Sequence, residues 1–323
     1  MFYYDFKVPE NKIWRVMIHT DCKLEADDQY AVVHHLLTPK YEVTGIVASH
    51  FNDSAIGKPM EEIGQMIRKI HADINPLETA LASRDEVLKI LRLMGIEGSV
   101  PVAAGAPVPL KNESEAVWSE GAQLIIDEAL KEDSRPLFLC CQAPLTDVAS
   151  ALLLRPEIAE KMTIIWVGGG SYPAGGYEYN LLADIKAANV VFSSQVPLWQ
   201  IPVGTYKQIG VTLAELQYHV KPCGAIGRYL FEQMAEFNEK AKIFPLFPHG
   251  ESWGLGDSAP VGVLLQELEK EDFILVHAPH IRPDMTYKER IDSRKIRVYH
   301  RVDSRMILGD FFAKLAIQFG KNG

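Results

Sequence analysis

Short apolar runs alternate with longer segments of helical periodicity along nearly the whole chain. The runs have the length of buried strands, and the segments between them place apolar residues three or four positions apart, as on one helix face. We expect strands at 13–19, 42–49, 100–104, 136–141, 163–167, 198–203, 273–277 and 296–302. We expect helices at 28–37, 59–70, 86–94, 121–131, 146–154, 184–192, 224–242 and 304–319, with another after residue 257. This alternation is typical of βαβ units. It predicts a single α/β domain over residues 1–323, with an open, mostly parallel sheet and helices on both faces.

The composition excludes several classes of protein. Hydrophobic residues make up 47% of the 323 residues and charged residues 23%, the balance of a folded globular protein rather than a disordered chain. The formal net charge of −9 argues against a nucleic-acid backbone as main partner, because such binding requires clustered cations. No apolar run is long enough to span a bilayer, no secretory signal is evident, and four cysteines are too few for a disulfide scaffold. We therefore expect a cytoplasmic protein that binds a small molecule and neither nucleic acid nor membrane.

An acidic loop follows the first expected strand. Asp21, Glu25, Asp27 and Asp28 fall within eight positions, where the strand ends and the next helix begins. In an open parallel sheet, ligands bind at the carboxyl ends of the strands. Carboxylates at a helix N-terminus can act as caps, but one Asp is enough for that purpose. Four carboxylates repel one another unless a cation neutralises them. The loop therefore indicates either a capped acidic turn or a site for a hard cation such as Ca²⁺ or Mg²⁺.

This loop and six further segments resemble the inosine-uridine preferring nucleoside hydrolase family, over about residues 13–319. The family opens with a strand that ends in an Asp-rich DxDPGxDD loop. The chain has the longer spacing D-x3-E-x-D-D, with His19 in place of the first Asp. The family's TGGLTNIA turn is matched by Leu-Thr-Asp-Val-Ala, which carries Asp147 and lacks the two glycines. All six segments follow in the family's order, at 44–52, 100–105, 145–149, 165–170, 178–188 and 256–258.

The resemblance implies a calcium-dependent ribonucleoside hydrolase that releases the base and ribose. By position, calcium would be held by Asp21, Asp28, Asp257 and the backbone carbonyl of Gln142, and Asp27 would accept a hydrogen bond from a sugar hydroxyl. The metal would fix a water molecule below the anomeric carbon, and Asp21 would act as its general base. The bond would break through an oxocarbenium-like state, with inversion and without a covalent intermediate. The resemblance also implies a homodimer or homotetramer.

Residues from later loops would contact the substrate. Asn52, Glu178 and Asn180 stand where the family contacts the ribose. From the residues alone, Asn52 could instead cap the following helix, Asp257 could cap the helix that it begins, and Glu178 and Asn180 could be ordinary loop residues. Two other functions stay open: the same fold and metal site acting on another ribosyl or glycosyl substrate, or a weakly catalytic protein that binds a nucleoside or sugar.

The residue before Asp257 departs from the family pattern. Many members have a His there that assists departure of the base, whereas this chain has Gly256, which cannot donate a proton. We expect activation from the Pro- and Gly-rich loop 244–256, unless the substrate itself supplies it. The candidate proton donors are His249 and Glu251 in this loop and His50 outside it. Trp253, also in the loop, could instead stack its ring on the base. Trp253 could equally be a packing residue.

Overall fold

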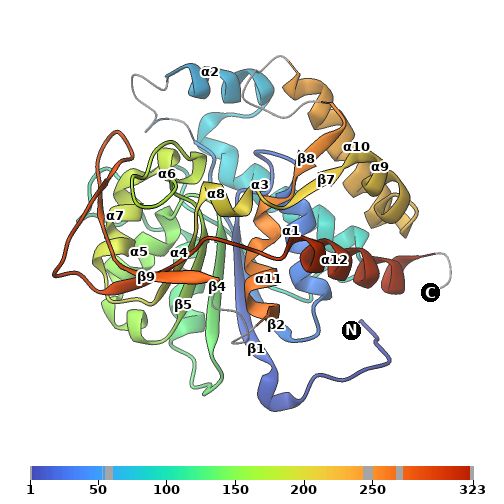
Figure 1. Cartoon of the computed structure of the whole chain (residues 1–323), viewed down its shortest axis with the longest axis horizontal. Coiled ribbons are helices and arrows are strands. Elements are labelled where there is room, and N and C mark those ends of the chain that lie inside the picture. Colours follow the sequence, from blue (N-terminus) through green and yellow to red (C-terminus); the bar gives the residue numbers. More distant parts are fainter. Residues whose placement is uncertain (1, 53, 55–60, 243–249, 267–271, 321–323) are drawn as a thin grey trace.

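An eight-stranded sheet forms the centre of the protein (Figure 1). The computed structural model describes residues 2–52, 54, 61–242, 250–266 and 272–320. The strand order is β3-β2-β1-β4-β5-β6-β12-β9, and neighbours are parallel except for β9, which runs antiparallel to β12 at one edge. This confirms the predicted open, mostly parallel α/β sheet. The strands are β1 (Trp14–Thr20), β2 (Tyr41–Ala48), β3 (Val102–Ala104), β4 (Leu137–Gln142), β5 (Thr163–Val167), β6 (Leu198–Ile201), β9 (Phe273–His277) and β12 (Lys295–Tyr299).

Helices cover both faces of this sheet, as predicted (Figure 1). Successive residues of a strand point to opposite faces, so β1 sends Val16 and Ile18 into one apolar core and Met17 into the other. The first core is covered by α1 (Asp28–Leu37), α3 (Thr79–Leu93), α10 (Gly224–Ala241), α11 (Ala259–Gln266) and α12 (Ser304–Phe319). The second is covered by α4 (Glu120–Ala129), α5 (Thr146–Leu154) and α7 (Ile185–Ser193).

Several boundaries differ from the expected ones. Helix α3 begins at Thr79 rather than at 86, because a 3-10 turn at Pro76–Glu78, capped by the side chain of Asn75, leads into it. Part of the expected loop 244–256 is strand β8 (Ser252–Gly254), which pairs antiparallel with β7 (Gly210–Thr212). Residues 244–249 of the expected loop lie outside the described part of the chain. The same is true of residues 59–60, the first two of the expected helix 59–70. The remaining short elements are α2 (Glu61–Ile70), α6 (Tyr179–Ala183), α8 (Val203–Tyr206), α9 (Leu213–Glu215), β7 (Gly210–Thr212), β8 (Ser252–Gly254), β10 (His280–Ile281) and β11 (Tyr287–Lys288).

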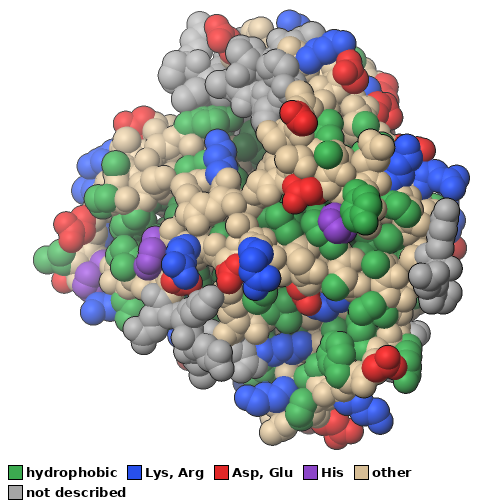
Figure 2. All heavy atoms as spheres, turned by 45° about the vertical axis from the view of Figure 1, so that its right-hand side comes forward, with side chains coloured by type: hydrophobic (Ala, Val, Ile, Leu, Met, Phe, Trp, Pro, Cys, Tyr) green, Lys and Arg blue, Asp and Glu red, His purple; other side chains and the backbone are tan. Residues whose placement is uncertain are grey.

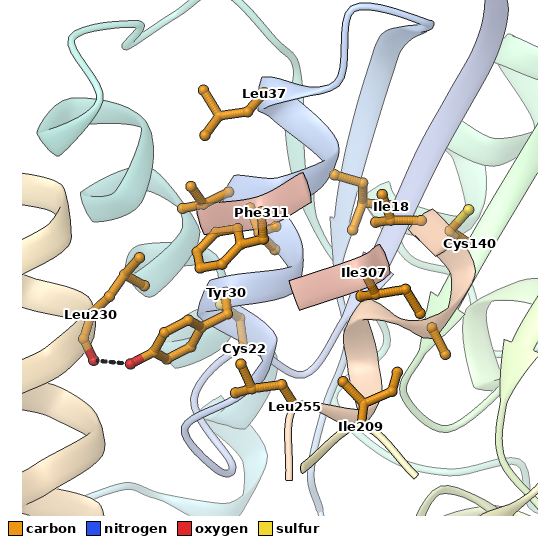
Figure 3. Close-up of a cluster of buried hydrophobic side chains, with 14 of the residues drawn as sticks. Ile18, Cys22, Tyr30, Leu37, Cys140, Ile209, Leu230, Leu255, Ile307 and Phe311 are labelled. Atoms are coloured by element: carbon orange, nitrogen blue, oxygen red, sulfur yellow. Dashed lines mark hydrogen bonds between the residues drawn. The ribbon is translucent and has the colours of Figure 1, made fainter. Parts of the chain in front are cut away.

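The core on the α1 face fixes the two segments that carry the acidic residues. Tyr30 of α1 is buried and donates a hydrogen bond from its hydroxyl to the carbonyl of Leu230 in α10, at 2.8 Å (Figure 3). Cys22, next to Asp21, and Leu255, two residues before Asp257, are buried in the same cluster (Figure 3). The polar residues of both segments are therefore held in place by apolar neighbours.

None of the described helices combines the length and the apolar character that crossing a membrane requires. On the face shown in Figure 2, Lys and Arg side chains lie interspersed with Asp and Glu and form no continuous basic stripe.

Candidate active site

The acidic loop joins β1 to α1. Asp21 follows the last residue of β1, and its backbone carbonyl accepts hydrogen bonds from the N–H groups of Lys23 (2.5 Å) and Leu24 (2.8 Å), which turns the chain sharply. Asp27 stands at the N-cap of α1, but its side chain makes no capping hydrogen bond. Its carboxylate instead accepts the backbone N–H of Asp257 at 3.4 Å. Capping therefore does not account for the side chain of Asp27.

Three carboxylates from two distant segments converge beside this loop. Asp27, Asp28 and Asp257 each offer an oxygen atom, and these atoms lie within 4.8 Å of one another. The hydroxyl of Thr20 and, at 3.4 Å, the side-chain amide of Gln142 donate hydrogen bonds to Asp28. Acidic oxygens gathered in this way are a suitable ligand set for a hard divalent cation.

Burial raises the pKa of all the acidic groups here. It raises the pKa of Asp27 to about 6 and that of Asp28 to about 7. The pKa values of Asp21 and Asp257 lie well above the usual range, because of burial first and then the repulsion of neighbouring carboxylates. Full ionisation of the group at neutral pH therefore needs a compensating positive charge.

Two unsatisfied oxygen atoms also fit a bound cation. The Oδ2 atom of Asp21 and the Oε1 atom of Gln142 are buried and have no hydrogen-bond partner among the described residues. Buried polar atoms are rarely left without a partner, so each such atom calls for an explanation. Carboxylate and carbonyl oxygens are the ligands that Ca²⁺ prefers. The cluster could therefore bind a metal ion. Of the other predicted ligands, Asp21 directly follows β1 and Gln142 ends the neighbouring strand β4; the unpartnered atom of Gln142 is its side-chain Oε1, whereas the prediction was its backbone carbonyl.

A cavity of about 780 Å³ opens beside Asp27, a size that suits a nucleoside. Among its described lining residues, carboxylates predominate over cations, since Lys207 is the one basic side chain. The acidic side chains of the lining are Glu25, Asp27, Glu178 and Glu215, and its large rings are Tyr177, Tyr179, Tyr206 and Trp253.

Glu178 and Asn180, both predicted to bind ribose, lie at the start of α6. The carboxylate of Glu178 accepts hydrogen bonds from the backbone N–H groups of Gly169 (2.8 Å), Asn180 (3.1 Å) and Leu181 (2.9 Å). Glu178 lines the cavity, and these donors hold its carboxylate in one orientation. The side-chain amide of Asn180 donates to the carbonyl of Val167 at 2.9 Å.

Asn52, the other predicted ribose contact, is hydrogen-bonded to backbone groups of three segments. Its amide donates to the carbonyls of Pro76 (2.8 Å) and Pro107 (3.2 Å), and its Oδ1 accepts the N–H of Ser54 (2.8 Å). It borders a second, smaller cavity of about 250 Å³ rather than the one beside Asp27.

The candidates for leaving-group activation are placed very differently. Trp253 is buried, lines the cavity and packs edge-on against Phe237, with ring centroids 5.6 Å apart. His50 is also buried, but it is hydrogen-bonded to Thr146 at 2.8 Å and is not among the lining residues. Glu251 is exposed and does not line the cavity either. His249 lies outside the described residues.

Tyr206, which sequence reasoning missed, lies against Gly256. A Cβ atom added at Gly256 would come within 2.6 Å of the Cδ2 atom of Tyr206. The Tyr206 hydroxyl donates a hydrogen bond to Glu178 at 3.2 Å. No local pattern marks Tyr206, because it meets Gly256 only through the fold.

The acidic cluster at the carboxyl edge of a parallel sheet, with a cavity beside it, is the arrangement of a metal-assisted hydrolase. Residues 78–310 match the family described as inosine-uridine preferring nucleoside hydrolase, and the chain belongs to that family. It is an N-glycosyl hydrolase, and the family supports hydrolysis of the N-glycosidic bond of ribonucleosides.

Known proteins agree with this assignment. The chain is 26% identical over 239 residues to the pyrimidine-specific ribonucleoside hydrolase RihA of Salmonella schwarzengrund (strain CVM19633), covering 72% of this chain and 73% of that protein. The fold is similar to the purine-preferring ribonucleoside hydrolase from Gardnerella vaginalis, with a TM-score of 0.70, 18% identity and coverage of 94% and 98%. It is also similar to the plant nucleoside hydrolase PpNRh1, with a TM-score of 0.67, 16% identity and the same coverage.

Proposed function

We propose that the chain hydrolyses the N-glycosidic bond of a ribonucleoside in the cavity beside Asp27, with Ca²⁺ as its metal. The observation that carries this proposal is the convergence of Asp27, Asp28 and Asp257 next to a cavity of about 780 Å³. Asp28, Asp257, Asp21 and the backbone carbonyl of Gln142 would hold the cation. When bound, the cation supplies a positive charge that orients the vicinal hydroxyls of the sugar and increases the acidity of nearby water.

The side chains divide the remaining work. Asp21 accepts the proton of the attacking water at Oδ2, which has no partner among the described residues. Asp27 lines the cavity whereas Asp28 does not, which supports Asp27 as the acceptor for a sugar hydroxyl. Glu178, held by its backbone donors, places a fixed negative charge near the oxocarbenium-like sugar. Asn52 and Asn180 stay predictions as ribose contacts, and each would have to exchange a hydrogen bond to a backbone carbonyl to make one.

The sequence of chemical steps follows from this arrangement. Water attacks C1′ from the side of Asp21, the C1′–N bond breaks, and the electron pair leaves with the base. Because water displaces the base directly, the product is ribose of inverted configuration. Proton NMR of the first product in a fast reaction distinguishes the two anomers, and retention of configuration would contradict the roles given to Asp21 and Glu178.

The decisive experiment is a hydrolysis assay with and without metal. The purified protein is treated with a chelator, then supplied with Ca²⁺ and tested on a panel of nucleosides and on nitrophenyl riboside, with release of reducing ribose as the readout. We expect turnover that disappears on chelation and returns with Ca²⁺. Asp28→Asn should lose the Ca²⁺ response, whereas Asp127→Asn, on the exposed side of α4, should keep it. Full turnover in the chelated protein would refute the metal assignment.

The single domain, the homodimer or homotetramer and the cytoplasmic location stay predictions from the sequence. Light scattering of the purified protein tests the assembly.

A further inference from the structure

A neutral base needs a proton in order to leave, and Gly256 has no side chain that could donate one. The packing around Gly256 also leaves no room for such a side chain. The ring of Tyr206 occupies the space that a side chain at 256 would require, with its Cδ2 atom 2.6 Å from an added Cβ. The Tyr206 hydroxyl is itself engaged with Glu178 at 3.2 Å. None of the described residues that line the cavity is a histidine.

The same cavity is built to attract positive charge. Four of its described lining residues are carboxylates, against one lysine, Lys207. The cation cluster can use Asp27, but Glu25, Glu178 and Glu215 are not among the three carboxylates that converge; the carboxylate of Glu215 also accepts hydrogen bonds from Thr212. The backbone carbonyl of Glu25 accepts a hydrogen bond from the side chain of Gln29 at 3.3 Å, but its carboxylate makes no hydrogen bond or ion pair to a described residue, although the acidic loop places it at the cavity wall.

Aromatic rings complete this wall. Tyr177, Tyr179, Tyr206 and Trp253 all line the cavity. The faces of aromatic rings attract cations, and more strongly so where water is excluded. Carboxylates and rings around one cavity are the means by which proteins bind flat organic cations.

We propose that the preferred substrates carry a permanently cationic base, such as an N-ribosylpyridinium or an N7-alkylated purine riboside; this inference rests on the hydrolysis proposed above. Water attacks C1′ and gives its proton to Asp21. The C1′–N bond breaks, and its electron pair neutralises the ring nitrogen. The base then leaves as a neutral molecule and needs no proton. The absence of a proton donor at Gly256 therefore does not slow the reaction. The neutral product also loses its attraction to Glu25, which favours its release.

Two substrate pairs test this inference. The first pair, inosine and 7-methylinosine, compares turnover of a neutral and a cationic base. Absence of a general acid costs about 10²–10⁴ in rate, and only the neutral base bears that cost. We expect kcat/KM for 7-methylinosine to exceed that for inosine by at least about a hundredfold.

The second pair, nicotinamide and N1-methylnicotinamide, measures recognition of charge without turnover. Calorimetric titration should show tighter binding of the cation by about tenfold or more, the size of a desolvated cation–ring contact. Glu25→Gln should remove most of this preference, and Glu215→Gln serves as a second variant if the first fails to fold. Glu232→Gln makes the same charge change on the exposed side of α10 and should leave the preference intact.

The outcomes separate the two proposals. Hydrolysis of nitrophenyl riboside with no preference for either cation would overturn this inference and leave the hydrolase function standing. Preferential binding of N1-methylnicotinamide without hydrolysis of any riboside would support charge recognition and contradict the proposed function. Equal loss of binding in Glu25→Gln and Glu232→Gln would also overturn the inference.

Discussion

The contact between Gly256 and Tyr206 predicts how position 256 responds to substitution. In Gly256→Ala the new Cβ would lie 2.6 Å from Tyr206 Cδ2, well inside the 3.4 Å at which ordinary contact begins. The Cδ2 atom is part of a ring that is held at its far end by Glu178, so the ring cannot simply turn away. Overpacking of this kind costs about 1–3 kcal/mol. Gly256 does not have a left-handed backbone, so the steric contact is the whole cost.

Urea unfolding of a double-mutant cycle measures this cost. In a Tyr206→Ala background the obstruction is gone, and Gly256→Ala should be neutral or stabilising by up to about 1 kcal/mol, because Ala restricts the unfolded chain. Gly254→Ala is the matched control: it lies in the adjacent strand β8, and an added Cβ there meets nothing within 4 Å. It should change the free energy of unfolding by less than about 0.5 kcal/mol in both backgrounds. If Gly256→Ala were equally costly with and without the Tyr206 ring, the steric explanation would be wrong.

Three further results are expected. Because Asp27 and Asp28 have pKa values of about 6 and 7 and must be ionised to bind Ca²⁺, the rise in Tm on adding Ca²⁺ should be larger at pH 8 than at pH 6; a rise independent of pH would contradict the cluster as the site. Asp21→Asn keeps the shape of the side chain but removes the proton acceptor, so kcat on nitrophenyl riboside should fall by about 10²–10⁴ with little change in KM, and near-normal turnover would remove Asp21 from the mechanism. Trp253→Ala removes a buried ring packed on Phe237 and should lower the free energy of unfolding by about 3–5 kcal/mol. If Trp253 also activates the base, turnover of a natural nucleoside should fall far more than that of nitrophenyl riboside. Equal losses on both substrates would mean that Trp253 only packs the site.

The layers of this fold could be predicted because each central strand is a continuous apolar run. Strands buried on both faces, such as β4, are apolar at nearly every position, so they can be recognised from their own sequence without knowing which strands they pair with. The short strands β7 and β8 leave none, since three residues show no periodicity and their pairing joins positions some forty residues apart. The early start of α3 could have been predicted, because Asn75 followed by Pro76 is a common signal for the beginning of a helix.

The acidic residues of the site could also be predicted from a short stretch of sequence. The residues that surround them in the fold could not. Asp21, Asp27 and Asp28 are near neighbours in sequence, so their crowding is visible in the chain itself. Tyr206 and Gly256 are fifty positions apart, and only the packing of α8 against the segment before α11 brings them together. Glu25 was visible as a fourth carboxylate, but its position at the cavity wall rather than in the converging cluster depends on how the loop folds.

Two departures from the family pattern prove to be contacts within the fold. His19 stands where the family has an Asp, and Asp147 where it has an Asn; their side chains meet, Nε2 to Oδ2, at 3.2 Å, and both are fully buried. An unpaired buried charge would be strongly destabilising, so either residue depends on the other. In the same way, Gly256 and Tyr206 occupy one volume between them. Both pairs are therefore explained by charge balance and packing within the fold, which the chain must keep whatever its substrate, so neither departure can be read by itself without the residue that it contacts.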